Sequence, residues 1–472
     1  MAITFELRCG ATTLDLAETP DTDAGISTLE YAPAVGDLEA RPVTDAMRLQ
    51  VDAASDDALA TYVQALDQMR LYAMRYRSDP TWEDPVWIHA KMNEESNERR
   101  ALVRAIEMDW ESNPHAESGL ARRHMANFEL RLERGPWERA TARSGATLGS
   151  TAGTIIEYDY TGGGTPYDPA GDIPARVAYA RLRNYSATTA LTRAWMGFRS
   201  AAKHGTLANF EPVWECEDGD NNVAESGITD QVDATASGGD RVQVVETDLD
   251  WDAGDYYEVL SISLTDVSAN EVDQFGDFLW LLRAMLSAAD STWEVQLRWG
   301  YYYMDDAQFV RGRIVEVSAT SWNIHEMGRA PIPLRNLHVF GLDVLDDDAE
   351  VTYTVQIWAR RTSGAANLYL DMVGLIPLDE GWAKLSGFNL DAATIEYVAI
   401  AEGADGQMQA LAFNSTPDID AVAVAAAVDF RVPIGDGRLF LIGAGSASHL
   451  IADGIGADLT YYERWLNLRG AE

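Results

Sequence analysis

Residues 292–299 read Thr-Trp-Glu-Val-Gln-Leu-Arg-Trp, with an apolar side chain at every second position from Trp293 to Trp299. A period of two is typical of a β-strand with one buried face. Residues 351–357, Val-Thr-Tyr-Thr-Val-Gln-Ile, repeat this pattern. Polar turns separate further such runs. Many short alternating strands predict a β-sandwich, specifically a jelly roll, over residues 173–380.

The first 140 residues have a mixed pattern, which predicts an α/β unit. Residues 46–52, 85–92, 100–110 and 124–134 read as strands. Between them, residues 57–76 place apolar side chains three or four apart, as a helix that covers a sheet does. Ser55 is suited to cap the start of this helix, and Asp56 and Asp57 suit its positive end.

The composition changes after this unit. Residues 141–172 are rich in glycine and small polar residues, including Gly162-Gly163-Gly164-Thr165-Pro166, and predict a linker. Residues 381–472 predict a third, small β domain, with its clearest strands at 395–401 and 438–442. The expected fold class is therefore mainly β with one α/β unit, divided into domains 1–140, 173–380 and 381–472.

Charge restricts the partners. The 472 residues hold 75 Asp and Glu against 36 Lys and Arg, for a formal net charge of −39. Such a chain repels phosphate backbones, so no nucleic-acid partner is expected. Lysine occurs only at Lys91, Lys203 and Lys384. A GC-rich genome, which favours arginine codons, and a halophilic host, whose proteins are acidic, both fit this composition.

Neither a membrane span nor a metal knuckle is expected. No apolar run approaches the ~20 residues that cross a bilayer. The N-terminal residues lack the basic start and apolar stretch of a signal peptide. The two cysteines, Cys9 and Cys216, form no Cys-x-x-Cys pattern and are expected as buried free thiols.

Catalytic patterns are weak throughout, and the chain is expected not to be an enzyme. Residues 303–306, Tyr-Met-Asp-Asp, repeat a string of reverse transcriptases, but without a basic template channel they read as a polar turn. No Gly-x-Ser-x-Gly or His-x-x-x-His pattern occurs. No cofactor is expected, and paired carboxylates for glycoside cleavage cannot be recognised in so acidic a chain.

Two groups of residues are candidate binding sites. The acidic run Asp346, Asp347, Asp348 and Glu350 is a weak candidate for Ca²⁺, and a solvated turn is the favoured interpretation. Exposed aromatic side chains stack on sugar rings. Four aromatic residues are glycan-contact candidates, with burial in the core as the competing interpretation: Trp299, Tyr301, Tyr303 and Trp322.

Several segments together resemble a known family. Residues 134–138, Arg-Gly-Pro-Trp-Glu, close the first unit, and residues 461–470, Tyr-Tyr-Glu-Arg-Trp-Leu-Asn-Leu-Arg-Gly, close the chain. Between them stand residues 171–175, 193–199 and 370–378. In order and spacing they resemble the distal tail proteins of long-tailed, siphovirus-like phages and archaeal tailed viruses, with an inserted jelly roll similar to a carbohydrate-binding module. Residues 210–275 match no part of that family.

The resemblance implies a structural virion protein. Its N-terminal domain would form a ring, usually a hexamer, at the tail tip or baseplate. The ring would join the tail tube and tape-measure proteins to tail hub or fibre proteins, and the outward sandwich would have weak affinity for a host surface glycan. The expected location is the virion tail. The alternatives are a glycan-cleaving tail spike and a stand-alone carbohydrate-binding surface protein.

Overall fold

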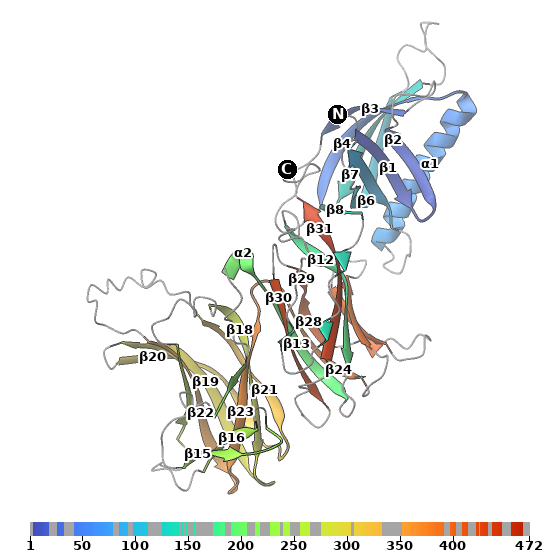
Figure 1. The fold of residues 1–472 in the computed structure, drawn as a ribbon. Coiled ribbons are helices and arrows are strands. Elements are labelled where there is room, and N and C mark those ends of the chain that lie inside the picture. Colours follow the sequence, from blue (N-terminus) through green and yellow to red (C-terminus); the bar gives the residue numbers. More distant parts are fainter. Residues whose placement is uncertain are drawn as a thin grey trace.

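A computed structural model describes most of the chain and shows three domains in a row (Figure 1). The described residues are 3–17, 26–32, 42–78, 85–92, 98–111, 125–140, 143–144, 148–149, 155–156, 173–184, 190–204, 213–217, 227–236, 239–245, 255–264, 275–303, 306–332, 352–390, 397–402, 408–413, 422–423, 425–432, 437–445 and 455–465. Strands dominate all three domains, which confirms the expected mainly β fold with one sheet-plus-helix unit. No helix in these ranges is both long and apolar enough to cross a membrane.

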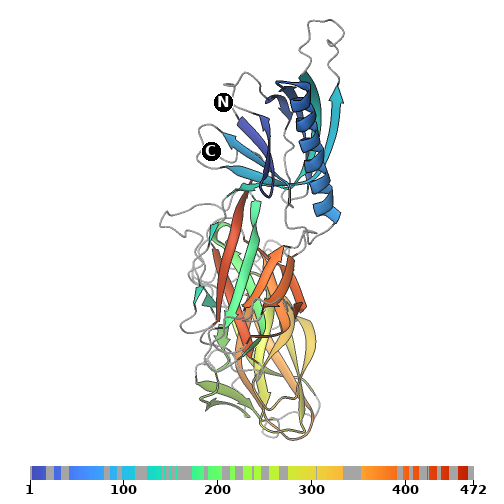
Figure 2. The ribbon, with the colours of Figure 1, turned by 90° about the vertical axis from the view of Figure 1, so that its right-hand side faces the viewer.

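The N-terminal domain is a bent antiparallel sheet with one long helix against it (Figure 2). Ser55 caps the helix as expected, since its Oγ accepts a hydrogen bond from the Ala58 amide at 3.1 Å. Leu66, Met69 and Ala73 of the helix are buried in the domain core. The elements are β1 (Ile3–Cys9), β2 (Thr12–Ala17), β3 (Ile26–Ala32), β4 (Val43–Asp52), α1 (Asp56–Ser78), β5 (Trp87–Met92), β6 (Arg99–Glu111), β7 (Met125–Arg134) and β8 (Trp137–Arg139).

The second domain, here called the proximal sandwich, packs two sheets face to face. One has the order β31-β12-β25-β26-β27 and the other β11-β30-β13-β24-β28. Alternating apolar side chains from both sheets form its core. Its elements are β9 (Arg143–Ser144), β10 (Leu148–Gly149), β11 (Ile155–Ile156), β12 (Ile173–Asn184), β13 (Leu191–Ser200), α2 (Ala201–His204), β24 (Trp382–Leu390), β25 (Tyr397–Glu402), β26 (Met408–Phe413), β27 (Val422–Ala423), β28 (Ala425–Asp429), β29 (Arg431–Val432), β30 (Gly437–Gly445) and β31 (Ile455–Trp465).

The third domain, the distal sandwich, is inserted between β13 and β24 of the proximal one. Its sheets have the orders β15-β16-β23-β18-β21 and β17-β22-β19-β20. The alternation that predicted a sandwich is confirmed, because Trp293, Val295 and Leu297 are fully buried between the sheets. Its elements are β14 (Val213–Glu215), β15 (Ile228–Val232), β16 (Asp240–Val244), β17 (Tyr257–Leu264), β18 (Gly276–Leu286), β19 (Thr292–Tyr303), β20 (Asp306–Val317), β21 (Asn323–Ile332), β22 (Thr352–Ser363) and β23 (Leu368–Pro377).

The two sandwiches form a stack of four sheets. The β13–β30 face of the proximal sandwich packs on the β18–β21–β23 face of the distal one (Figure 1). Trp195, Ile376 and Ile442 are buried in this contact between the sandwiches. Gly374 lets the layers approach, because a Cβ on it would lie 2.8 Å from Ile442 Cδ1. The sandwiches are therefore packed against each other, not merely tethered.

The grouping of strands differs from the expected division into 173–380 and 381–472. Strands β12 and β13 belong with the C-terminal strands: β12 pairs with β31 and β25, and β13 pairs with β30 and β24. Residues 381–472 are therefore not a separate domain, since their strands complete the proximal sandwich. The expected linker, 141–172, contributes β9 and β10 beside β31 and β11 beside β30. Strand alternation predicts strands but not their distant partners, which explains the wrong grouping.

Candidate functional site: the domain junctions

Three neighbouring strands join the N-terminal domain to the proximal sandwich. Strand β8 pairs with β6 on one side and with β31, the last strand of the chain, on the other. Arg100, Glu138 and Arg464 stand opposite one another on these strands. Arg100 Nε donates to Glu138 Oε1 at 3.1 Å, and Arg464 Nε lies 3.7 Å from Glu138 Oε2. One buried carboxylate thus binds an arginine from each domain.

Aromatic rings hold this junction in place. The Arg100 guanidinium carbon lies 4.0 Å from the ring centre of Trp87 and 4.4 Å from that of Tyr462. Trp87 belongs to the N-terminal domain and Tyr462 to β31. Burial lowers the pKa of Arg464 to about 10, a value at which the guanidinium stays charged at neutral pH. Because β8 pairs with β6 and with β31, one sheet order passes through both domains: β2-β1-β5-β6-β8-β31-β12-β25-β26-β27.

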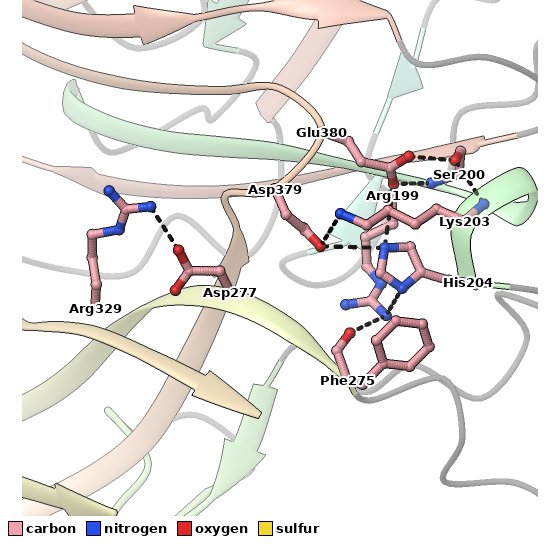
Figure 3. Close-up of polar contacts among 9 residues, drawn as sticks. All are labelled: Arg199, Ser200, Lys203, His204, Phe275, Asp277, Arg329, Asp379 and Glu380. Atoms are coloured by element: carbon pink, nitrogen blue, oxygen red, sulfur yellow. Dashed lines mark hydrogen bonds and ion pairs between the residues drawn. The ribbon is translucent and has the colours of Figure 1, made fainter. Parts of the chain in front are cut away.

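A second polar junction lies where the chain crosses between the sandwiches (Figure 3). Glu380 stands on the return crossing, between β23 and β24. Its Oε2 accepts the Ser200 amide at 2.6 Å, and its Oε1 accepts the Ser200 hydroxyl at 2.5 Å. Beside it, Asp379 Oδ2 accepts from Lys203 Nζ at 2.8 Å. The outward and return crossings are thus tied together by two carboxylates.

His204 lies at the centre of this junction and its side chain is fully buried. Its Nδ1 is 2.9 Å from Arg199 Nη2, which can only donate, so a neutral ring carries its proton on Nε2. That Nε2 faces Glu380 Oε2 at 3.3 Å and Asp379 Oδ2 at 3.5 Å. Arg199 Nη2 also donates to the Phe275 carbonyl at 2.9 Å.

The junction contains serine, histidine and acidic side chains, but they are not arranged for nucleophilic catalysis. A catalytic serine needs its hydroxyl directed at a base such as histidine. Here Ser200 Oγ donates to Glu380, and the His204 ring is sealed from solvent. The arrangement holds two chain crossings in place, and we assign it a structural role.

Further polar contacts fasten the faces of the two sandwiches. Trp195 Nε1 donates to Glu326 Oε1 at 3.0 Å, and Lys384 Nζ donates to Glu326 Oε2 at 2.6 Å. Arg193 donates to the Ile324 carbonyl at 3.2 Å and to Asn323 Oδ1 at 2.7 Å. The donors stand on β13 and β24, and every acceptor stands on β21. These bonds fix the relative position of two sheets that apolar packing alone would leave free to slide.

His325, on the same strand, should make the distal part of the molecule sensitive to acid. Burial, together with the nearby Arg193 charge, lowers the pKa of His325 to about 4. A histidine with a depressed pKa is neutral in the folded protein and binds a proton more readily when unfolded. Stability is therefore complete above the ordinary pKa near 6.5 and falls as the pH drops toward 4, by about 2 kcal/mol at pH 5.

Denaturant unfolding at pH 7 and pH 5, for the native chain and for His325→Gln, measures this contribution. All other titratable groups are common to both proteins, so the difference between their pH dependences isolates His325. Glutamine should reduce the loss of stability between the two pH values. Equal losses in the two proteins would contradict the prediction.

The sequence-predicted aromatic residues do not form a common sugar-binding surface. Trp322 is only 2% exposed; its Nε1 donates to Thr235 Oγ1 at 3.0 Å, and the Arg283 guanidinium lies 5.0 Å from its ring. The prediction that Trp322 contacts a glycan is wrong, because its ring is covered by other side chains. Trp299 is half-buried and packs against the core of the distal sandwich, which favours the competing core interpretation.

The remaining candidates stay untested. Tyr301 and Tyr303 lie in β19 opposite Gln308 and Asp306, but their side chains are outside the described part of the structure. Asp346, Asp347, Asp348 and Glu350 lie entirely outside the described residues. Within the described ranges, no three His, Cys, Asp or Glu side chains are placed to hold a metal ion. Ca²⁺ binding by the acidic run therefore remains an expectation.

Two aromatic residues that sequence analysis missed face outward from the distal sandwich. Trp358 and Tyr256 are half-buried on the outer face of the β17-β22-β19-β20 sheet. A signal for Trp358 was present in the sequence. In the run Thr-Val-Gln-Ile-Trp-Ala-Arg, residues 354–360, it falls in phase with the polar residues and out of phase with buried Val355 and Ile357.

No family model matches the chain, and no curated protein matches it by sequence. Among solved structures, it is similar to the tandem CBM22 domains of Paenibacillus barcinonensis Xyn10C, at 10% identity over 59% of this chain and 98% of that one, with a TM-score of 0.22. It is similar to a protein of the phage p2 baseplate at 6% identity over 78% and 98%, with a TM-score of 0.20. A Paenibacillus xanthan lyase matches at 10% identity over 98% and 53%, with a TM-score of 0.24. Scores this low transfer no function.

Proposed function

We propose that this protein is a structural, non-enzymatic component of a viral tail tip. It forms a ring through its N-terminal domain and carries the sandwiches outward. The sequence resemblance to distal tail proteins supports this role. The observation that carries it furthest is the junction at β8, where strand pairing and the contacts of Glu138 with Arg100 and Arg464 fasten the N-terminal domain to the proximal sandwich.

The buried acidic residues support a structural rather than a catalytic role. Asp45, Glu138 and Asp371 are the buried carboxylates in the described part of the chain, and each is ion-paired with arginine. A buried carboxylate whose oxygens already accept from guanidinium donors has little hydrogen-bonding capacity left for a substrate. In this protein such pairs stabilise the domains and their junctions.

The outward side of α1 is a candidate surface for the ring contact. Leu71 is 57% exposed and Met74 is 52% exposed, one helical turn apart, on a helix whose opposite side is buried in the N-terminal core. Two large apolar side chains side by side on a helix suit an interface between subunits.

The native chain is therefore expected to assemble into a closed ring, of six copies by resemblance, and the double variant Leu71→Asp, Met74→Asp is expected to remain monomeric. Light scattering and particle images measure both outcomes. Val232→Asp is the matched control, since Val232 is 87% exposed on the distal sandwich, away from α1. A native chain that stays monomeric at every concentration and salt tested would refute the proposed function.

A further inference from the structure

The last sheet of the four-layer stack has an outer face that no other sheet of the chain covers. Its order is β17-β22-β19-β20, and it lies on the side of the distal sandwich away from the proximal one (Figure 1). Its inner face supplies Val295, Val355 and Ile357 to the core. Residues in the opposite phase of the same strands face outward: Thr354 and Gln356 are buried there, whereas Arg298, Trp358 and Arg360 are partly exposed.

Aromatic rings and hydrogen bonds hold two arginines on this face. The Arg298 guanidinium carbon lies 3.9 Å from the ring centre of Trp358, and its Nε donates to Gln296 Oε1 at 3.1 Å. Arg360 lies 4.5 Å from the ring centre of Tyr256, and its Nε donates to Glu294 Oε2 at 2.8 Å. A guanidinium fixed by stacking and by its Nε loses little freedom when a ligand binds its Nη atoms.

Positive charge gathers on one side of this face. Arg298 stands opposite Arg311 in the β19–β20 register, and like charges in opposed positions destabilise a sheet. Burial and the nearby Arg311 charge lower the pKa of Arg298. Within the described residues, the Nη atoms of Arg298 form no hydrogen bond.

Two carboxylates lie near these arginines, and both already have partners in the protein. Glu294 already accepts from Arg360 and from the Tyr256 hydroxyl at 2.5 Å. Burial raises the pKa of Glu258, while the nearby Arg298 charge opposes that shift, so Glu258 offsets Arg298 only in part. A chain with a net charge of −39 thus presents Arg298 and Arg311 side by side on this face, with Trp358 stacked on Arg298.

We propose that this outer face binds an acidic polysaccharide built from hexuronic acid units. The planar Nη fork of Arg298 matches a carboxylate, which it can hold through two parallel hydrogen bonds. Arg311, on the neighbouring strand, binds a second carboxylate of the same chain. The rings of Trp358 and Tyr256 hold the guanidinium groups of Arg298 and Arg360 in place beside the bound sugars. This assignment goes beyond the proposed function and does not depend on ring formation.

Calorimetry on the full chain in 0.1 M NaCl tests this assignment with three probes of similar length: oligogalacturonate, neutral dextran and dextran sulfate. Oligogalacturonate should bind best. Arg298→Gln and Arg311→Gln should each weaken its binding about tenfold, as the loss of one charge-assisted contact does. Arg329→Gln, an exposed arginine on β21 in the opposite sheet, should bind like the native chain. Circular dichroism and melting temperature check that each variant is folded.

Several results would overturn the assignment. Oligogalacturonate bound no more tightly than dextran would remove the carboxylate recognition. Equal binding of dextran sulfate would show attraction to any polyanion instead of a uronate site. Unchanged binding in both folded arginine variants would place the site elsewhere. Self-association that Arg311→Gln abolishes would identify an acidic second copy of the chain as the occupant.

Discussion

Arg134→Ala should lower the free energy of unfolding of the N-terminal domain by about 3–5 kcal/mol, the usual effect of removing one partner from a buried ion pair. Arg134 and Asp45 are both completely buried. Arg134 Nε donates to Asp45 Oδ2 at 2.5 Å and Nη2 donates to Oδ1 at 3.1 Å. Tyr31 adds a hydrogen bond to Oδ2 at 2.6 Å, and burial beside Asp45 raises the pKa of Tyr31. Alanine would leave the Asp45 carboxylate buried and short of two donors.

Hydrogen exchange on the full chain measures this loss where it occurs. Strands β4 and β7 pair along their length, from Val43 opposite Arg134 to Asp52 opposite Met125. Their amides should lose about 3–5 kcal/mol of protection against exchange, while the amides of the distal sandwich should keep their native protection. Arg131→Ala is the matched control on the same strand: its pair with Glu129 is exposed and its effect should be below about 1 kcal/mol. Similar losses for both variants would show that burial of the Arg134 pair is not what matters.

Gly197→Ala is expected to disrupt the contact between the sandwiches, at a cost reaching ~3 kcal/mol, the upper end for overpacking. A Cβ on Gly197 would lie 2.2 Å from the Pro377 carbonyl oxygen and 3.0 Å from the Pro377 nitrogen. Both are backbone atoms at the end of β23, where the chain returns to the proximal sandwich. Neither can rotate away, so the strands themselves must separate.

The same exchange measurement on the Gly197 variant should show lost protection in β13 and at the end of β23, with the N-terminal domain unchanged. Gly135→Ala provides the control, because its Cβ would meet only the Leu102 carbonyl at 3.9 Å. That change should be neutral or slightly stabilising, since alanine restricts the unfolded chain. Native protection at the crossing in Gly197→Ala would mean that the sandwiches are less closely packed than the structure shows.

Local features of the fold were predictable because they depend on neighbouring residues. The cap at Ser55 and the strand alternation around Trp293 are each encoded within a few positions. The pairing of β12 with β31 was not, because Arg181 meets Asp458 only after the whole distal sandwich has intervened. Alternation shows which face of a strand is buried but carries no information on which distant strand lies beside it.

The candidate sites were hard to predict for the same reason, because their residues come from distant parts of the chain. The junction cluster brings Arg199 and His204 together with Asp379 and Glu380, residues separated by the inserted domain. Trp322 reads as an aromatic residue beside a polar loop, and only the fold shows Arg283 and Thr235 covering it. The outward position of Trp358 could have been predicted, since its phase opposed that of its buried neighbours.

The insertion of one sandwich within another also imposes an order on synthesis. The ribosome releases β12 and β13 early, yet their partners β30 and β31 emerge only near the end of translation. The strands of the distal sandwich, β14 to β23, follow one another in the chain. The distal sandwich can therefore fold before β12 and β13 have all their partners. Until then two long apolar strands stand unpaired on the nascent chain, where they can aggregate or recruit a chaperone. A truncation that removes only β31 should therefore destabilise the protein strongly, because β31 is the strand that joins β12 to β8 at the junction.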